Sequence, residues 1–314
     1  MRGKILVIRG GAIGDFILTL PAITALRGHF PEAHLEILGY PHIAQLALAA
    51  KVVDRVQGIE ARGLAGFFAR KGDLSEELAD YFSEFDVILS FLYDPDRIFQ
   101  ENVARCTKAQ FITGPHRAQD AEPLHATKVY LKPLERLAIF DADTVPNLFI
   151  GEPSSPLHQL ALHPGSGSPI KNWPEEKWAE LLRYLSRSTD YRFLLIGGEA
   201  EGERLERLSR IFDADSTRLQ LAQSLPLIEL AGLIQRCKLF IGHDSGISHL
   251  AAALGLPGLI LWANTPLDVW RPPSKKVRIL QHPTVLEALP VDTVIEAFHE
   301  LERGIAKIST TPTS

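Results

Sequence analysis

The segment Asp244-Ser245-Gly246 and the nearby His249 combine residue types that suit the binding of a phosphate group. The apolar run 238–241 before them predicts a buried strand, and the Ala-rich residues from Ile247 onward predict a helix. The first backbone amides of a helix have no intrahelical partner and carry the positive end of its dipole. Glycine lets an anion approach those amides closely. The sequence therefore predicts an anion site at this turn, with a carboxylate and an imidazole beside it.

The same residues also allow a purely structural interpretation. An Asp or Ser before a helix is a common N-cap, and His249 would then be an ordinary buried helix residue. Turns of this kind are frequent between the strands and helices of α/β proteins. The rest of the chain has to decide between the two interpretations.

Two further turns follow predicted strands in the same half of the chain. The first is His163-Pro164-Gly165-Ser166-Gly167-Ser168, with Lys171 close behind it. Small residues with free amides and one lysine suit a diphosphate, although a lysine is also commonly just solvated. The second is Gly197-Gly198 with Glu199 and Glu201, whose carboxylates suit ribose hydroxyls or a helix N-terminus. Three turns at the carboxyl ends of parallel strands converge on one crevice, which favours nucleotide binding.

A glycine-rich turn near the N-terminus carries a different signal. Gly10, Gly11 and Gly14 do not form G-x-G-x-x-G. The second predicted strand also ends without the acidic residue that would hold a ribose, so a dinucleotide oxidoreductase is disfavoured. The residue that stands out is Asp15, at the carboxyl end of the first strand, whose alternative role is an N-cap.

These turns need a parallel sheet to bring them together, and the apolar pattern predicts one in each half of the chain. The predicted strands are 4–8, 34–39, 86–92, 110–114, 160–163, 193–197, 239–242 and 258–262, with helices between them such as 175–186 and 201–211. Strands that alternate with helices predict βαβ units.

A cluster of Pro, Gly and Ser over residues 146–159 predicts a domain boundary. We therefore expect an α/β protein with a Rossmann-like domain over residues 1–152 and a second over 153–314. The ligand site is expected in a cleft between the two facing domains. The sequence also allows the last helix of the chain to pack back on the N-terminal domain.

Composition narrows the class of protein. The chain has 314 residues, 46% of them hydrophobic, and a net charge of −5, which suits a globular protein and disfavours a nucleic-acid binder. Cys106 and Cys237 are too few for a disulfide framework or a cysteine metal site, so we expect a reducing, cytoplasmic location. No segment has the pattern of a signal peptide or the length of a transmembrane helix.

The motifs together resemble glycosyltransferase family 9, the ADP-heptose:lipopolysaccharide heptosyltransferases. The matching pieces, in the family's order, are Gly14-Asp15 with Leu20-Pro21, His163-Pro164-Gly165-Ser166 with Lys171-x-Trp173-Pro174, Gly197-Gly198 with a following Glu, Asp244-Ser245-Gly246-x-x-His249 with Ala251-Ala252-Ala253-x-Gly255-x-Pro257, and Thr265-Pro266 with Trp270-Arg271-Pro272. The Asp244–Pro257 block is specific by itself, whereas the other pieces are specific only in combination.

This resemblance implies a GT-B fold and an inverting transfer from a nucleotide sugar, with no metal or other cofactor. It makes Asp15 the general base on the acceptor hydroxyl. The residues that it implies for the donor diphosphate are Lys171, which would also stabilise the leaving group, the loop His163, Ser166 and Gly167, and the amides of Ser245 and Gly246. The resemblance also implies that Asp244 and His249 orient the diphosphate and that Glu201 or Glu199 binds the ribose.

The implied partners are ADP-heptose and an anionic glycolipid, the lipopolysaccharide inner core at the cytoplasmic face of the inner membrane. The acceptor candidates are Gly14, Arg62, Arg97 and Arg117. Residues 64–71 mix apolar and basic side chains, which suits either peripheral membrane contact or packing on their own domain. The D-x-D pattern typical of metal-dependent glycosyltransferases occurs at 94–96, 141–143 and 213–215, too often to be informative.

Two other functions stay open at this point. In the first, the chain is a relative within the same family that uses another nucleotide sugar or a soluble acceptor. In the second, the chain belongs to another class of protein, which binds a nucleotide sugar without turnover. The presence of Asp15 argues against this second function.

Overall fold

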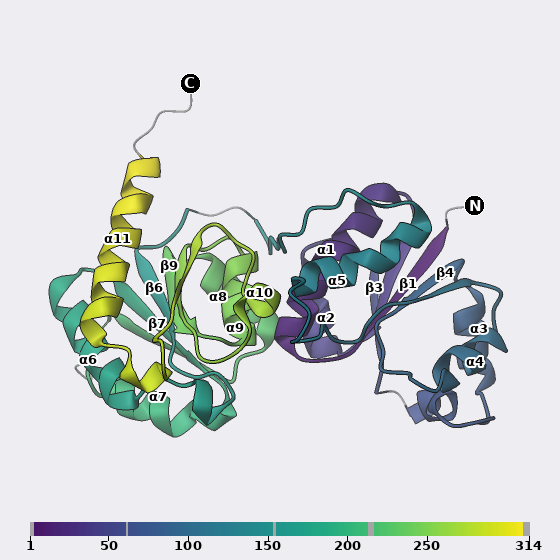
Figure 1. The fold of residues 1–314 in the computed structure, drawn as a ribbon, viewed down its shortest axis with the longest axis horizontal. Coiled ribbons are helices and arrows are strands. Elements are labelled where there is room, and N and C mark those ends of the chain that lie inside the picture. Colours follow the sequence, from purple (N-terminus) through teal and green to yellow (C-terminus); the bar gives the residue numbers. More distant parts are fainter. Residues whose placement is uncertain (1–2, 61, 153–154, 213–216, 310–314) are drawn as a thin grey trace. The chain divides into compact units, whose positions relative to one another are not determined.

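The structure is a computed structural model that describes residues 3–60, 62–152, 155–212 and 217–309. The chain folds into two compact units. Unit 1 contains the residues up to Leu148 together with Asp268–Trp270, and unit 2 contains Phe149–Leu267 and the chain from Arg271 onward. Figure 1 shows that each unit holds one sheet with helices packed on both of its faces. This confirms the predicted α/β class with two Rossmann-like sheets.

The sheet of unit 1 has five parallel strands in the order β3-β2-β1-β4-β5. The strands are β1 (Lys4–Arg9), β2 (His34–Gly39), β3 (Arg55–Gly58), β4 (Val87–Ser90) and β5 (Gln110–Thr113). The register pairs Ile5 with Leu35 on one side and with Val87 on the other. Parallel strands are covered on both faces, which explains why the central strands are continuous apolar runs rather than alternating ones.

Helices cover both faces of this sheet. They are α1 (Ile13–His29), α2 (Pro41–Ala49), α3 (Glu76–Ser83), α4 (Ile98–Ala104) and α5 (Ala126–Leu131), with 3-10 turns η1 (Arg62–Phe68) and η2 (Lys132–Leu137). Phe67, Phe82 and Phe99 pack against Leu6 and Ile8 of the central strand, so η1, α3 and α4 share one face. α1 and α5 lie side by side (Figure 1).

The sheet of unit 2 has six parallel strands in the order β11-β10-β9-β6-β7-β8. The strands are β6 (Gln159–His163), β7 (Arg192–Gly197), β8 (Leu219–Gln223), β9 (Leu239–His243), β10 (Gly258–Leu261) and β11 (Val277–Leu280). In both units the strand order reverses once, between β1 and β4 and between β6 and β9. The loops diverge at such a switch point, which opens a crevice outside the carboxyl ends of the strands.

The helices of unit 2 complete the fold. They are α6 (Glu175–Ser188), α7 (Gly202–Ser209), α8 (Leu227–Gln235), α9 (Gly246–Ala253), α10 (Leu267–Trp270) and α11 (Val291–Ser309), with turns η3 (Pro169–Lys171), η4 (Glu199–Glu201) and η5 (Leu286–Ala288). The last helix packs on unit 2, because Val294 and Phe298 join its core beside Trp178. Among the described residues, no helix is both long and apolar enough to cross a bilayer.

We expect Gly39→Ala, at the end of β2, to lower the free energy of unfolding by about 1–3 kcal/mol. A Cβ there would lie 2.5 Å from the main-chain oxygen of Arg9, so β1 and β2 would have to separate. The control is Gly232→Ala in α8, where a Cβ meets nothing within 4 Å, and it should be neutral or stabilise by about 0.5–1 kcal/mol. Urea denaturation measures both, and equal stability of the two variants would contradict the close packing of β1 and β2.

Candidate active site

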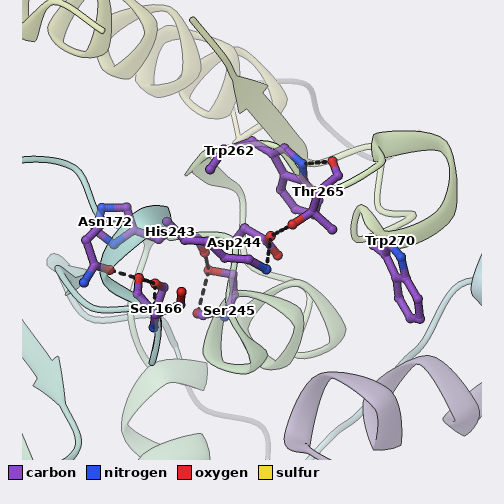
Figure 2. Close-up of polar contacts among 12 residues, drawn as sticks. Ser166, Asn172, His243, Asp244, Ser245, Trp262, Thr265 and Trp270 are labelled. Atoms are coloured by element: carbon purple, nitrogen blue, oxygen red, sulfur yellow. Dashed lines mark hydrogen bonds and ion pairs between the residues drawn. The ribbon is translucent and has the colours of Figure 1, made fainter. Parts of the chain in front are cut away.

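The predicted donor residues of unit 2 meet at the switch point between β6 and β9. Lys171 Nζ lies 2.7 Å from Asp244 Oδ2, and Thr265 Oγ1 donates to the same oxygen at 2.5 Å (Figure 2 shows the Thr265 contact). The Asp244 side chain is only 7% exposed, whereas 32% of the Lys171 side chain is exposed. The buried carboxylate therefore holds an ammonium group that still reaches solvent.

The N-terminus of α9 combines an N-cap with the turn that is predicted to bind an anion. Ser245 is the N-cap, and its hydroxyl accepts from the amide of Ser248 at 3.4 Å and lies 3.3 Å from His163 Nδ1. The amides of Gly246 and Ile247 come before this capped position, where a helix offers no acceptor of its own. The structural and the anion-binding interpretations are thus compatible. His249 is buried within the helix.

His243, the last residue of β9, links the strand to the loop that carries Lys171. Its Nε2 accepts from the main-chain N–H of Trp173 at 2.9 Å and from Trp178 Nε1 at 3.1 Å. Its Nδ1 lies 3.2 Å from the carbonyl oxygen of Gly165, which can only accept, so Nδ1 carries the proton. The imidazole is neutral and fully buried, and it fixes both ends of the loop 165–173.

The loop after β6 is shaped by its own side chains. Ser166 Oγ lies 2.7 Å from Asn172 Oδ1 (Figure 2). It also lies 2.8 Å from the carbonyl oxygen of Ser168. The hydroxyl that we expected to contact phosphate is therefore engaged within the loop. Gly167 has a φ of +70°, and a Cβ there would meet nothing within 4 Å, so its backbone is open to a ligand.

Glu201 lies beside this loop. Its Oε2 accepts from the amide of Gly198 at 3.0 Å, and a Cβ on Gly165 would lie 2.6 Å from its Oε1. The absence of a side chain at Gly165 therefore lets the carboxylate approach the end of β6. Glu199 is exposed in η4, and among the described residues no contact of this kind brings it to the loop. Of the two glutamates, Glu201 is the one that the fold brings to the predicted donor residues.

Asp15 in unit 1 lies in the first turn of α1, with 31% of its side chain exposed. The N-cap of α1 is Ala12, so the alternative N-cap role of Asp15 is wrong. The guanidinium of Arg9 lies 3.9 Å from Asp15 Oδ1 and donates to the main-chain oxygen of Asp15 at 3.1 Å and to that of His116 at 2.7 Å. Arg9 is buried, with its charge over the ring of Tyr130 at 4.7 Å, and so fixes the turn that carries Asp15.

The acceptor candidates lie on several elements of unit 1. Gly14 precedes Asp15 in α1, and Arg62 opens η1. Arg97 precedes α4 with a φ of +57° and contacts Gln100 at 3.3 Å through Nε. Arg117 pairs with Asp120 at 3.7 Å. Arg62, Arg97 and Arg117 are all exposed, and a role in acceptor binding stays a prediction for each of them.

The D-x-D pattern at 94–96 has a structural role. Asp94 stabilises the first turn of α4, because its carboxylate accepts from the amides of Phe99 at 3.2 Å and Gln100 at 3.0 Å. Asp96 pairs with Arg70 at 3.3 Å. Asp143 of the second copy accepts from the amide of Val145 at 2.9 Å, and the third copy, 213–215, lies outside the described residues. Both aspartates of the first copy and Asp143 of the second therefore have partners within the protein.

Comparison with known proteins identifies the class. Residues 125–288, just over half of the chain, match the profile of glycosyltransferase family 9 (heptosyltransferase). The chain therefore belongs to glycosyltransferase family 9. Lipopolysaccharide heptosyltransferase 3 of Escherichia coli strain K12 is 24% identical over 292 residues, covering 84% of this chain and 83% of that protein. Lipopolysaccharide heptosyltransferase 2 of the same strain is 27% identical over 150 residues, covering 47% and 43%.

Solved structures share the fold. The E. coli ADP-heptose lipopolysaccharide heptosyltransferase II has a TM-score of 0.75 at 19% identity, covering 95% of this chain and 98% of that one. An E. coli heptosyltransferase solved with ADP has a TM-score of 0.74 at 21% identity, covering 95% and 99%. The chain is thus a family 9 glycosyltransferase enzyme whose two parallel sheets match those of GT-B heptosyltransferases.

Because His163 and His243 are buried, we expect the folded protein to lose stability in acid. Burial lowers the pKa of His243 to about 3 and that of His163 to about 4, whereas both titrate near 6.5 in the unfolded chain. Below pH 6.5 both histidines are protonated in the unfolded chain but stay neutral in the folded protein. The free energy of unfolding therefore falls as the pH drops from 6.5 towards 4. Each histidine contributes up to about 1.4 kcal/mol per pH unit.

Urea denaturation between pH 4.5 and 7 should show that His243→Gln, which keeps one donor and one acceptor, has a shallower pH slope than the unmodified protein. His42→Gln, at an exposed position of α2, is the matched control and should leave the slope unchanged. Identical slopes for all three proteins would contradict a buried neutral imidazole at position 243.

Proposed function

We propose that the protein transfers heptose from ADP-heptose to the inner core of a lipopolysaccharide precursor, with inversion at the anomeric carbon and without a metal ion. The observation that carries this proposal is the meeting of Lys171, Asp244, the α9 N-terminus and Glu201 at one switch point of unit 2. A positive side chain, open amides and a carboxylate are what a nucleoside diphosphate requires.

Each donor group has a separate task in this proposal. The diphosphate lies against Lys171, the amides of Gly246 and Ile247, and the open backbone at Gly167. Glu201 accepts hydrogen bonds from the ribose hydroxyls. Asp244 and Thr265 position Lys171, so that its charge is fixed before the substrate arrives. The donor identity is supported by a structural neighbour, an E. coli heptosyltransferase solved with ADP-2-deoxy-2-fluoro heptose.

The reaction is a single displacement. The carboxylate of Asp15 takes the proton of the acceptor hydroxyl while that oxygen forms a bond to the anomeric carbon. The bond from this carbon to the diphosphate oxygen breaks, and ADP leaves with the electron pair. Negative charge therefore grows on the diphosphate, where Lys171 and the helix amides stabilise it more strongly than in the ground state.

The acceptor assignment places the enzyme at a membrane surface, at the cytoplasmic face of the inner membrane. In η1, Leu64 and Phe67 are buried in unit 1, whereas Phe68 and the following Arg70 and Lys71 are exposed. An exposed aromatic ring beside cations suits the interface of an anionic bilayer. This arrangement supports peripheral contact, with the glycolipid presented from the membrane.

The proposed function is tested by incubating the enzyme with ADP-heptose and an inner-core acceptor that lacks heptose, and by measuring the product by mass spectrometry. We expect a mass increase of one heptose, with ADP released in equal amount, in the presence of EDTA. Transfer from a different nucleotide sugar, or to a soluble sugar only, would reassign the substrates. Tight donor binding without any transfer would instead indicate a binding protein.

Asp15→Asn should lower the transfer rate by about 10²–10⁴-fold, because the amide cannot accept the proton of the acceptor hydroxyl. Its affinity for ADP should stay near that of the unmodified enzyme, since Asp15 acts on the acceptor. Asp80→Asn, at an exposed position of α3, is the control and should leave the rate unchanged. Turnover by Asp15→Asn near the unmodified level would show that another group is the base.

Lys171→Ala should weaken ADP binding about 10- to 100-fold, which corresponds to the loss of one hydrogen bond to a charged group. The transfer rate should fall as well, because the leaving diphosphate loses a compensating charge. Lys275→Ala, at an exposed lysine of the same unit, should change neither quantity. Calorimetry with ADP provides the affinity, and an unchanged value for Lys171→Ala would remove this residue from the donor site.

A further inference from the structure

Tyr93 is an exposed aromatic residue at the switch point of unit 1. It follows β4, the strand next to β1 on the side where the strand order reverses, and Asp15 follows β1. The side chain of Tyr93 is exposed, with 71% of the residue accessible to solvent. Loops at the carboxyl ends of two such strands border the crevice in which α/β sheets bind ligands. The ring of Tyr93 is therefore placed where a substrate of unit 1 would lie.

The ring of Tyr93 is supported from one side. The centroid of the His116 ring lies 4.6 Å from it, at an interplanar angle of 62°. His116 follows β5, the neighbour of β4, and is itself exposed. An edge-to-face pair of this kind favours a defined ring orientation. The two residues thus form an oriented aromatic surface that is open to solvent.

This surface is connected to Asp15 by one buried side chain. Arg9 donates to the carbonyl oxygen of His116 at 2.7 Å and to that of Asp15 at 3.1 Å. The guanidinium is planar and held at both ends, so the loop of His116 and the turn of Asp15 keep a fixed relation within unit 1. The aromatic pair and the proposed general base are consequently parts of one arrangement.

Sugar rings match such a surface in their chemistry. One face of a pyranose carries C–H groups that pack on an aromatic ring, while its hydroxyl groups require polar partners at the rim. Tyr93 Oη and the imidazole of His116 offer such partners, and both side chains combine an apolar body with a polar end. Arg97 and Arg117, in the same two loops, add positive charge for a carboxylate or phosphate on the sugar.

We propose that Tyr93, supported by His116, is the stacking platform for the acceptor sugar, the ring whose hydroxyl Asp15 deprotonates. This inference rests on the proposed function, because it assumes that unit 1 binds an anionic sugar acceptor. Tyr93 then determines acceptor affinity and orientation, and it has no part in donor binding.

The test uses the full-length enzyme and a lipid-free inner-core oligosaccharide, whose binding is followed by saturation-transfer difference NMR without any donor. Tyr93→Ala should weaken oligosaccharide binding about 10-fold, the loss of one aromatic contact, and should raise the acceptor KM by a similar factor. Tyr93→Phe should restore most of the affinity. The donor KM should stay unchanged in both variants.

The matched control is Phe140→Ala, which removes another exposed ring of unit 1, with 69% of the residue accessible. It should bind the oligosaccharide as the unmodified enzyme does. Equal affinity of Tyr93→Ala and the unmodified enzyme, or an equal loss in Phe140→Ala, would overturn the platform, as would absence of oligosaccharide binding by the unmodified enzyme. Binding without heptose transfer would contradict the proposed reaction and leave the platform intact.

Discussion

The proposed donor site of unit 2 depends on one buried, neutral imidazole. His243 stands at the end of β9 and makes hydrogen bonds to Gly165, Trp173 and Trp178. Two of these partners bracket the loop that presents Lys171, and the third belongs to the core beneath it. Because a neutral histidine offers one donor and one acceptor nitrogen, it can join a carbonyl to N–H groups in a way that no apolar residue can. Protonation would convert the accepting nitrogen into a donor and break the arrangement.

Unit 1 also has one buried polar side chain that fixes the backbone near its proposed site. Here that side chain is a cation, Arg9, rather than a neutral ring. Arg9 holds two main-chain oxygens and lies over the ring of Tyr130, so its charge is compensated by carbonyl dipoles and a π-system as well as by Asp15. In both units the side chains proposed for chemistry are partly exposed, while a buried polar residue behind them fixes their backbone. Pre-arrangement of this kind lets charged groups stabilise a transition state without reorganising during the reaction.

Most of the fold could be predicted from the sequence, because the central strands of both sheets are buried on both faces and read as apolar runs. The sequence did not predict three strands, β3, β8 and β11. All three are edge strands, whose exposed positions interrupt the run of apolar residues. The residues proposed to bind the donor could be singled out from the sequence because each follows a strand in a turn of small residues. His243 and Arg9 were missed as functional supports, since their partners come from segments far away in the sequence. The engagement of Ser166 with Asn172 likewise depends on loop geometry that residue types do not encode.

We propose that unit 2 binds an adenine nucleotide through Lys171, Asp244 and the α9 N-terminus, without a metal ion. Calorimetric titration of the enzyme with ADP, UDP and GDP, each with and without EDTA, tests it most directly. We expect a preference for ADP and the same affinity in EDTA, because in this proposal protein groups alone compensate the diphosphate charge. A preference for another base would contradict the donor assignment, and loss of ADP binding in EDTA would contradict the metal-free site.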